Sequence, residues 1–145
     1  MYLFINTQNN EYIELAVVDD QGSIIMENKI SARYEQSEKL LDEIEKIMKK
    51  GKTEFSGLKG VIVVTGPGGF TSLRIGVTTA NTLAWILQIP IVGIKSENKD
   101  LGEVVKEGYK KIKNKKSFKQ VLPEYGREPN ITVKKIKMKS EKCVI

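Results

Sequence analysis

An apolar run followed by a glycine-rich turn and an amphipathic helix constrains the fold of this chain more than any other feature. Residues 60–65 are apolar apart from the final threonine, which favours a strand buried on both faces. Residues 71–87 then repeat apolar side chains at helical spacing: Leu73, Val77, Ala80, Ala84 and Leu87. Pro90 ends this helix, and residues 91–94 form another short apolar run. The pattern predicts a strand–helix–strand unit with parallel neighbouring strands and a right-handed crossover.

Short apolar stretches near the N-terminus predict an antiparallel meander. Residues 2–6, 12–18 and 23–29 each have the composition of a strand, and polar turn residues separate them. Connections this short permit hairpins but not the crossovers that parallel strands need. We therefore expect these strands to pair in sequence order.

Other amphipathic patterns predict two further helices. In residues 35–50, apolar side chains recur between charged ones at helical spacing: Leu40, Leu41, Ile44, Ile47 and Met48. Gly51 is predicted to take the left-handed conformation that commonly ends a helix. Residues 99–114 repeat the helical pattern, and residues 131–138 alternate in part, as an edge strand does.

The predicted order of elements is βββ-α-β-α-β-α. A meander followed by parallel strand–helix units gives an α/β mixed sheet with helices on both faces. This is the arrangement of the ribonuclease H-like and actin-like ATPase (ASKHA) folds. Those folds carry nucleases, sugar kinases and chaperone ATPases alike, so the fold by itself selects no activity.

Composition limits the chemistry available to the chain. Its 145 residues are 40% hydrophobic and 29% charged, which is typical of one soluble domain with its own core. It has no histidine, and its single cysteine, Cys143, cannot form an internal disulfide. Zinc sites built on imidazole and thiolate, Ser/His/Asp triads and Cys/His dyads are therefore excluded.

The net charge of +6 is unevenly distributed. Residues 1–94 hold 9 Lys and Arg against 11 Asp and Glu, whereas residues 95–145 hold 15 against 7. The lysine-rich residues 110–116 would either contact nucleic-acid phosphates or form a solvated helix end and linker. Aromatic residues do not alternate with these lysines, so the run does not predict a base-stacking platform.

Targeting and membrane segments are not predicted. The apolar residues 1–5 are too few for a secretory signal and lack a basic flank. The apolar runs of the chain are all shorter than the roughly 20 residues that cross a bilayer. We expect a cytoplasmic protein without membrane contact.

The glycine-rich turn is the most informative segment for function. It lies between a predicted buried strand and a helix start, where unpaired backbone amides can bind an anion. The alternative is a tight turn in which Thr71 or Ser72 caps the helix. The spacing matches neither a Walker loop nor a dinucleotide fingerprint. The candidate anion-binding residues are Gly66, Pro67, Gly68, Gly69, Phe70, Thr71 and Arg74.

Residues 66–76 resemble the signature of a known family. They read Gly-Pro-Gly-Gly-Phe-Thr-Ser-Leu-Arg-Ile-Gly, similar to the Gly-Pro-Gly-Ser-Phe-Thr-Gly-Leu-Arg-Ile-Gly of the TsaB (YeaZ) family. Nine of the eleven positions agree, and Gly69 and Ser72 are the departures. TsaB proteins take part in making threonylcarbamoyladenosine at position 37 of tRNA (t6A37).

Weaker matches follow in the same order along the chain. Residues 4–7 resemble the family's opening Ala-Ile-Asp-Thr strand, and residues 37–41 resemble its His-Ser-Glu-x-Leu-Leu helix start. Residues 123–127 resemble its closing Pro-x-Tyr-Leu-Arg. The resemblance covers residues 1–95 well and implies a core domain there. Family members usually carry a second domain of similar fold. The resemblance therefore implies that residues 96–145 are a shortened basic remnant of it, with a helix and an edge strand.

The resemblance also implies a non-catalytic role. TsaB proteins are paralogues of TsaD, which binds ATP and a metal through a His-x-x-x-His motif and performs the transfer. Asn6 stands where actin-like ATPases have an aspartate near the metal and phosphates. We expect a scaffold subunit for TsaD that has no catalytic or metal-binding residue of its own. It should bind no cofactor tightly, and ATP or ADP only in the complex with TsaD.

The expected partner surface lies on two predicted helices. In the family these helices pack against TsaD, or against a second TsaB copy as a homodimer. TsaE is a further expected partner, and tRNA would be contacted indirectly. The lone Trp85 would anchor the interface or, alternatively, fold over its own core. The predicted interface residues are Glu35, Glu38, Leu41, Arg74, Thr78, Asn81 and Trp85.

Two other functions stay open at this point. The first is an active actin-like ATPase or glycoprotease-like enzyme, which predicts turnover by the isolated chain. The second is a basic tRNA-binding protein, which predicts binding of tRNA without TsaD and a steep loss of affinity with salt.

Overall fold

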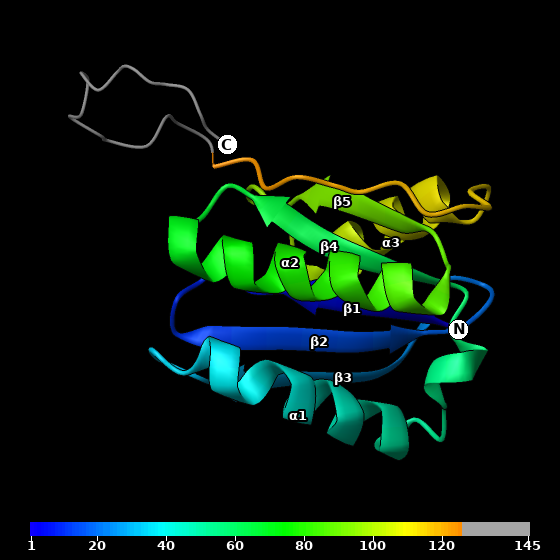
Figure 1. Cartoon of the computed structure of the whole chain (residues 1–145), viewed down its shortest axis with the longest axis horizontal. Helices are drawn as coiled ribbons and strands as arrows, with labels where there is room; N and C mark the ends of the chain where they lie inside the picture. The colour runs from blue at the N-terminus through cyan, green and yellow to red at the C-terminus, as the bar shows by residue number, and fades with distance from the viewer. Residues whose placement is uncertain (126–145) are drawn as a thin grey trace.

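The computed structural model describes residues 1–125, which fold around one five-stranded sheet. The strand order is β3-β2-β1-β4-β5 (Figure 1). The strands β1, β2 and β3 form an antiparallel meander, and β4 and β5 extend the sheet parallel to β1. Their bounds are β1 Tyr2–Asn6, β2 Tyr12–Val18, β3 Ile24–Ser31, β4 Gly60–Gly66 and β5 Ile91–Lys95.

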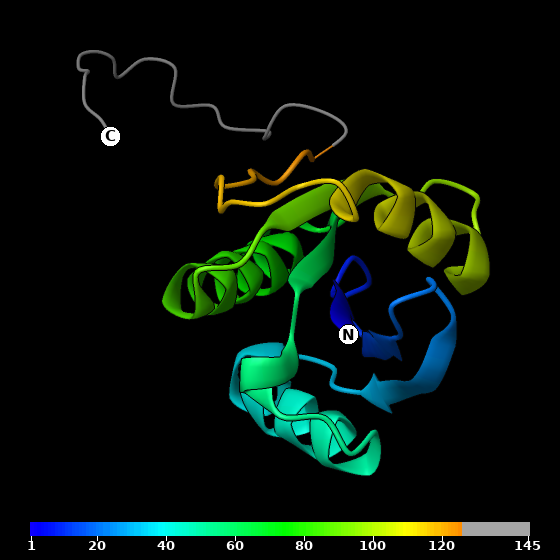
Figure 2. The same cartoon turned by 90° about the vertical axis from the view of Figure 1, so that its right-hand side faces the viewer.

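Helices cover both faces of the sheet. The helices α1 (Gln36–Lys50) and α2 (Phe70–Leu87) pack on one face. The helix α3 (Leu101–Ile112) packs on the other, as Figure 2 shows with the sheet between them. The predicted order of elements and the mixed sheet with helices on both faces are confirmed. A short 3₁₀ helix, η1 (Phe55–Gly57), was not predicted from the sequence.

The alternation of side chains along β1 divides the core into two layers. Leu3 and Ile5 pack on the α1–α2 side, whereas Tyr2 and Phe4 pack on the α3 side. Every residue of β4 is buried, as expected for a central parallel strand covered on both faces. Each large side chain fully removed from water stabilises the fold by about 1.5–3 kcal/mol.

The end of α1 differs from the sequence prediction. Gly51 has φ −79°, and Lys52 takes the left-handed conformation with φ 54°. The reason is that the helix continues through the Gly51 amide, which donates to the Ile47 carbonyl. The Thr53 amide then donates to the Met48 carbonyl, so the chain reverses one residue later than predicted.

Residues 113–125, called the 113–125 segment, return from α3 along the β5 edge of the sheet toward α2 (Figure 1). Phe118 and Val121 pack against the α1–α2 core layer, and the Glu124 amide donates to the Thr65 carbonyl (2.7 Å). The helix α3, which follows the predicted domain boundary at residues 95/96, packs on β4 and β5 of the same sheet. That boundary stays a prediction. Three sequence predictions lie outside the described residues: the last two positions of the Pro-x-Tyr-Leu-Arg match (126–127), the edge strand at 131–138, and the reading of Cys143.

Candidate functional site

The glycine-rich turn after β4 packs tightly against the loop between β1 and β2. Gly66 has φ +152° and a cis peptide bond to Pro67. A Cβ on Gly68 would lie 2.6 Å from the Gln8 carbonyl oxygen, so only glycine permits this approach. The Gln8 side-chain amide donates to the carbonyls of Pro67 (2.7 Å) and Ser96 (3.3 Å). Gln8 therefore joins the ends of β1, β4 and β5.

The first turn of α2 has no side-chain cap. Gly69 is the N-cap residue, and the Ser72 hydroxyl donates to the Gly69 carbonyl (3.3 Å) instead of accepting a backbone amide. Because α2 has Gly69 as its N-cap and no side-chain cap hydrogen bond, the capping by Thr71 or Ser72 in the alternative reading is wrong. Phe70 packs edge-on against Tyr125, with ring centroids 4.5 Å apart. Anion binding by this helix start stays a prediction.

Asn6, at the end of β1, is held by its neighbours. Its Nδ2 donates to Glu14 (3.1 Å), and its Oδ1 accepts the Gln8 backbone amide (2.8 Å). It lines a polar cavity of about 340 Å³ with Lys29 and Lys99, among others.

Within residues 1–125, no group of three or more His, Cys, Asp or Glu side chains could hold a metal ion. Over the same residues, no helix is long and apolar enough to span a membrane.

Buried contacts fix α2 on the sheet. The Thr7 hydroxyl, at the end of β1, donates to the Ser72 carbonyl (2.5 Å), and both residues are buried. A Cβ on Gly76, one helical turn later, would collide with the Thr7 side chain. The close approach of β1 and α2 sets the position of the outer face of α2, where the predicted interface residues lie.

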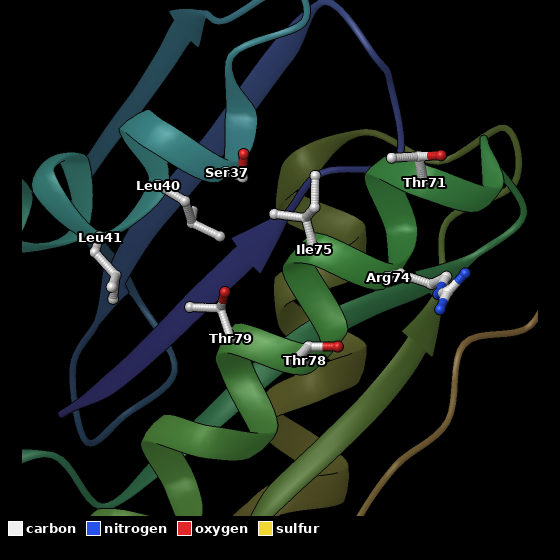
Figure 3. A pocket seen from close by; sticks show the side chains of 8 residues that line it. All are labelled: Ser37, Leu40, Leu41, Thr71, Arg74, Ile75, Thr78 and Thr79. Carbon is white, nitrogen blue, oxygen red and sulfur yellow. The ribbon is translucent and has the colours of Figure 1, made fainter. Parts of the chain in front are cut away.

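A groove separates the outer faces of α1 and α2. It encloses about 440 Å³, and Leu40 points into it from α1 while Ile75 and Thr79 point into it from α2 (Figure 3). Arg74 lines the same cavity but points away from α1. The full lining is Ser37, Leu40, Leu41, Thr71, Arg74, Ile75, Thr78 and Thr79.

Leu41, which lines this groove, remains exposed, and so do two apolar side chains that follow Thr78 and Thr79 by seven residues, about two turns further along the same side of α2. Leu41 of α1 is 60% exposed, and Trp85 and Ile86 of α2 are 60% and 63% exposed. We call the groove together with these three residues the α1–α2 surface. Exposed apolar groups that gather beside a groove mark an interaction site more often than singly scattered ones do.

Comparisons with known proteins find similarity to TsaB and TsaD proteins. A family model described as TsaD, tRNA N6-adenosine threonylcarbamoyltransferase, matches residues 28–98. The chain is 54% identical over 39 residues to "tRNA threonylcarbamoyladenosine biosynthesis protein TsaB" of Bacillus subtilis (strain 168), covering 27% of this chain and 17% of that protein. It is 36% identical over 76 residues to the TsaB of Buchnera aphidicola subsp. Acyrthosiphon pisum (strain APS), covering 52% and 33%. These matches support membership of the TsaB (YeaZ) family over the part of the chain that each one covers.

A solved structure shares the fold of this chain. YeaZ from Pseudomonas aeruginosa superposes with a TM-score of 0.60 at 21% sequence identity, covering 65% of this chain and 43% of that chain. The chain therefore matches less than half the length of each of these three proteins.

The structure brings only part of the predicted TsaB interface together. Leu41, Arg74 and Thr78 line one cavity, and Trp85 is exposed on the same helix, so the alternative in which Trp85 folds over its own core is wrong. Glu35 and Glu38 are exposed at the start of α1, where Glu35 pairs with Lys39 (3.2 Å).

Asn81 has a different neighbour from the other predicted interface residues. Its Oδ1 accepts the Val121 amide (3.0 Å), and its Nδ2 donates to the Val121 carbonyl (2.8 Å). Asn81 therefore holds the 113–125 segment on α2.

Two exposed residues were missed from the sequence. Ile86 is 63% exposed, and Tyr34 is 78% exposed with φ 61° just before α1. For Ile86 the signal was present: the buried stripe of α2 places positions 84 and 87 inward, which leaves 85 and 86 facing outward.

Proposed function

We propose that this chain takes part in forming N6-threonylcarbamoyladenosine in tRNA, as a non-catalytic subunit that binds a TsaD protein. The names of the TsaB relatives support the pathway, and the match to the TsaD model supports a common fold. The observation that carries the partner role is the α1–α2 surface. A 440 Å³ groove lined by exposed Leu41, with exposed Trp85 and Ile86 further along α2, suits a partner helix better than a polar substrate.

The same surface would serve a second copy of this chain when TsaD is absent. Homodimer formation and TsaD binding would then be mutually exclusive. ATP or ADP would bind only in the complex with TsaD, and TsaE would join that complex rather than the isolated chain.

The test measures binding to the TsaD protein of the same cell. Leu41→Asp and Trp85→Asp each place a charge in the proposed contact and should weaken Kd by about 30-fold or more, since truncating a central anchor costs about 2 kcal/mol or more. Ile25→Asp is the matched control, because Ile25 is 42% exposed on β3, outside the α1–α2 surface.

Circular dichroism and thermal melting check that all three variants fold. Loss of TsaD binding in the two surface variants but not in Ile25→Asp supports the assignment. Equal affinity of Leu41→Asp, Trp85→Asp and the parent chain for TsaD would refute it.

The match of residues 28–98 to the TsaD model favours one other function, an active ATPase or glycoprotease-like enzyme. Measuring ATP hydrolysis by the purified chain, alone and with TsaD, separates the two. Robust turnover by the chain alone supports the enzyme, and turnover only with TsaD supports the partner role.

A further inference from the structure

The helix α3 and the 113–125 segment carry the most concentrated charge among the described residues. Between residues 106 and 119 the chain has seven lysines and one acidic residue, Glu107. Among residues 1–125, one of these seven lysines forms an ion pair: Lys111 with Glu107 (3.7 Å). The others present their ammonium groups without a carboxylate partner from that part of the chain.

Six of these lysines form two rows. Lys106, Lys110 and Lys113 follow one side of α3, at spacings of four and three, and line a cavity of about 410 Å³ beside the β2–β3 turn. On the other side, Lys111, Lys115 and Lys119 line a cavity of about 290 Å³ against β5. We call these six residues the α3 lysine surface.

Folding does not require this arrangement. Lys110 and Lys111 interact favourably with the negative end of the α3 dipole, but Lys106 lies too far from it. Lys115 and Lys119 lie beyond the helix. Lysines four apart on a helix repel one another and lower its stability by a few tenths of a kcal/mol. Lys106 and Lys110, which are four apart on α3, therefore cost stability unless an anion binds to them.

We propose that the α3 lysine surface binds the phosphate backbone of RNA directly. The inference rests on the proposed function only for the choice of RNA as the polyanion. Lysines four apart on a helix are about 6 Å apart along its axis, so a row can contact successive phosphates. The second row begins on α3 with Lys111 and continues with Lys115 and Lys119 along the β5 edge, so the two rows offer phosphate contacts on both sides of the end of α3.

The chemistry of the surface predicts contact without sequence preference. Lysine is a point charge that neutralises phosphates, whereas arginine and aromatic residues read or stack on bases. Tyr109, the aromatic residue of α3, is half-buried, and its hydroxyl donates to the Asp20 carbonyl (2.7 Å). In residues 1–125 the large exposed apolar side chains all lie outside α3, and on the segment that carries Lys115 and Lys119 there is one, Leu122. A single side chain is far less than the apolar face with which a helix inserts into a membrane.

The row Lys106, Lys110 and Lys113 lies on α3, on the face of the sheet opposite α1 and α2 (Figure 2), whereas the row Lys111, Lys115 and Lys119 lies at the β5 edge. RNA on α3 would therefore leave the groove between α1 and α2 open to a protein partner. This goes beyond the proposed function, in which tRNA is contacted only through TsaD.

The experiment compares two triple variants with unfractionated tRNA, by fluorescence anisotropy at 50–200 mM salt. One variant replaces Lys106, Lys110 and Lys113 with alanine. The control replaces three exposed α1 lysines and removes the same charge: Lys46, Lys49 and Lys50. Each lost phosphate contact reduces the slope of log K against log salt by about 0.9, so the α3 variant should lose about 2.7 and the control little.

The other variants and a vesicle control give results that support or overturn the proposal. Replacing the three α3 lysines with arginine should retain binding, and thermal melting should show that all variants fold. Equal losses in the α3 and α1 variants would reduce the effect to net charge and overturn the proposal. So would binding to phosphatidylserine vesicles without binding to tRNA.

The same proteins, assayed with TsaD present, separate this proposal from the proposed function. If the parent chain binds TsaD but never tRNA, the α3 proposal fails and the partner role stands. If it binds tRNA through α3 but not TsaD, the partner role fails and the α3 proposal stands.

Discussion

Asn81 offers a sharp test of how the 113–125 segment is held. Both polar atoms of its side chain bond the backbone of Val121, 40 residues later in the chain, at 3.0 and 2.8 Å. Asn81→Ala removes both bonds and leaves a half-buried amide and carbonyl without these partners. At about 0.5–1.5 kcal/mol for each hydrogen bond, the free energy of unfolding should fall by about 1–3 kcal/mol.

The loss should be local as well as global. Hydrogen exchange at the Val121 amide should accelerate by about 5-fold to 150-fold, since each 1.4 kcal/mol corresponds to a factor of ten. Urea denaturation gives the global value. Thr82→Ala is the control, because Thr82 is the exposed neighbour on the same helix and its truncation should stay within about 0.5 kcal/mol of the parent.

Two results would refute this reasoning. One is an Asn81→Ala variant with the parent's unfolding free energy and the parent's exchange at Val121. The other is a variant of parental stability that binds TsaD weakly, which would return Asn81 to the partner interface where the sequence pattern placed it.

Two further predictions concern stability. Gly76→Ala should destabilise the fold by about 1–3 kcal/mol in urea denaturation, because its Cβ meets the Thr7 side chain and this overpacking exceeds the gain in helix propensity; a more stable variant would contradict the close packing of α2 on β1. Hydrogen bonds from Lys59 (2.8 Å) and the N-terminal amine (2.6 Å) lower the pKa of Asp20 to about 2. The lowered pKa of Asp20 stabilises the fold at pH values above about 4, the pKa of the carboxyl in the unfolded chain. This stabilisation is lost as the pH falls through about 2. Asp20→Asn should therefore destabilise at pH 7 and match the parent near pH 2, and a gap that is constant across a pH series of melts would contradict this.

Local sequence patterns were sufficient to predict most of the fold. The bounds of β1 and β2 agree with the prediction because polar turn residues flank both apolar runs. The buried stripes of α1 and α2 followed from helical spacing, since periodicity directly encodes which face is covered. The ends of elements were harder: Lys52, not Gly51, takes the left-handed conformation, because hydrogen bonding at the helix end decides the point of reversal.

Long-range contacts limited how much of the candidate site could be predicted from the sequence. Gln8 contacts Pro67 across 59 positions, and Asn81 contacts Val121 across 40. Periodicity carries no information about such pairs. It placed Asn81 in line with Arg74 and Trp85 on one face of α2, but could not show that the chain returns to cover part of that face.

The distinction between residues that hold the fold and residues that leave it unaffected supports the assignment of the α1–α2 surface. Thr7 and Asn81 bond backbone atoms of distant segments, so their loss should appear in the unfolding free energy. Leu41, Trp85 and Ile86 leave more than half of their accessible surface in water, so polar replacements should change that free energy by no more than about 0.5 kcal/mol. These apolar side chains add little to folding, and a partner that buries them explains why they are exposed. A large loss of stability on replacing them would remove that argument.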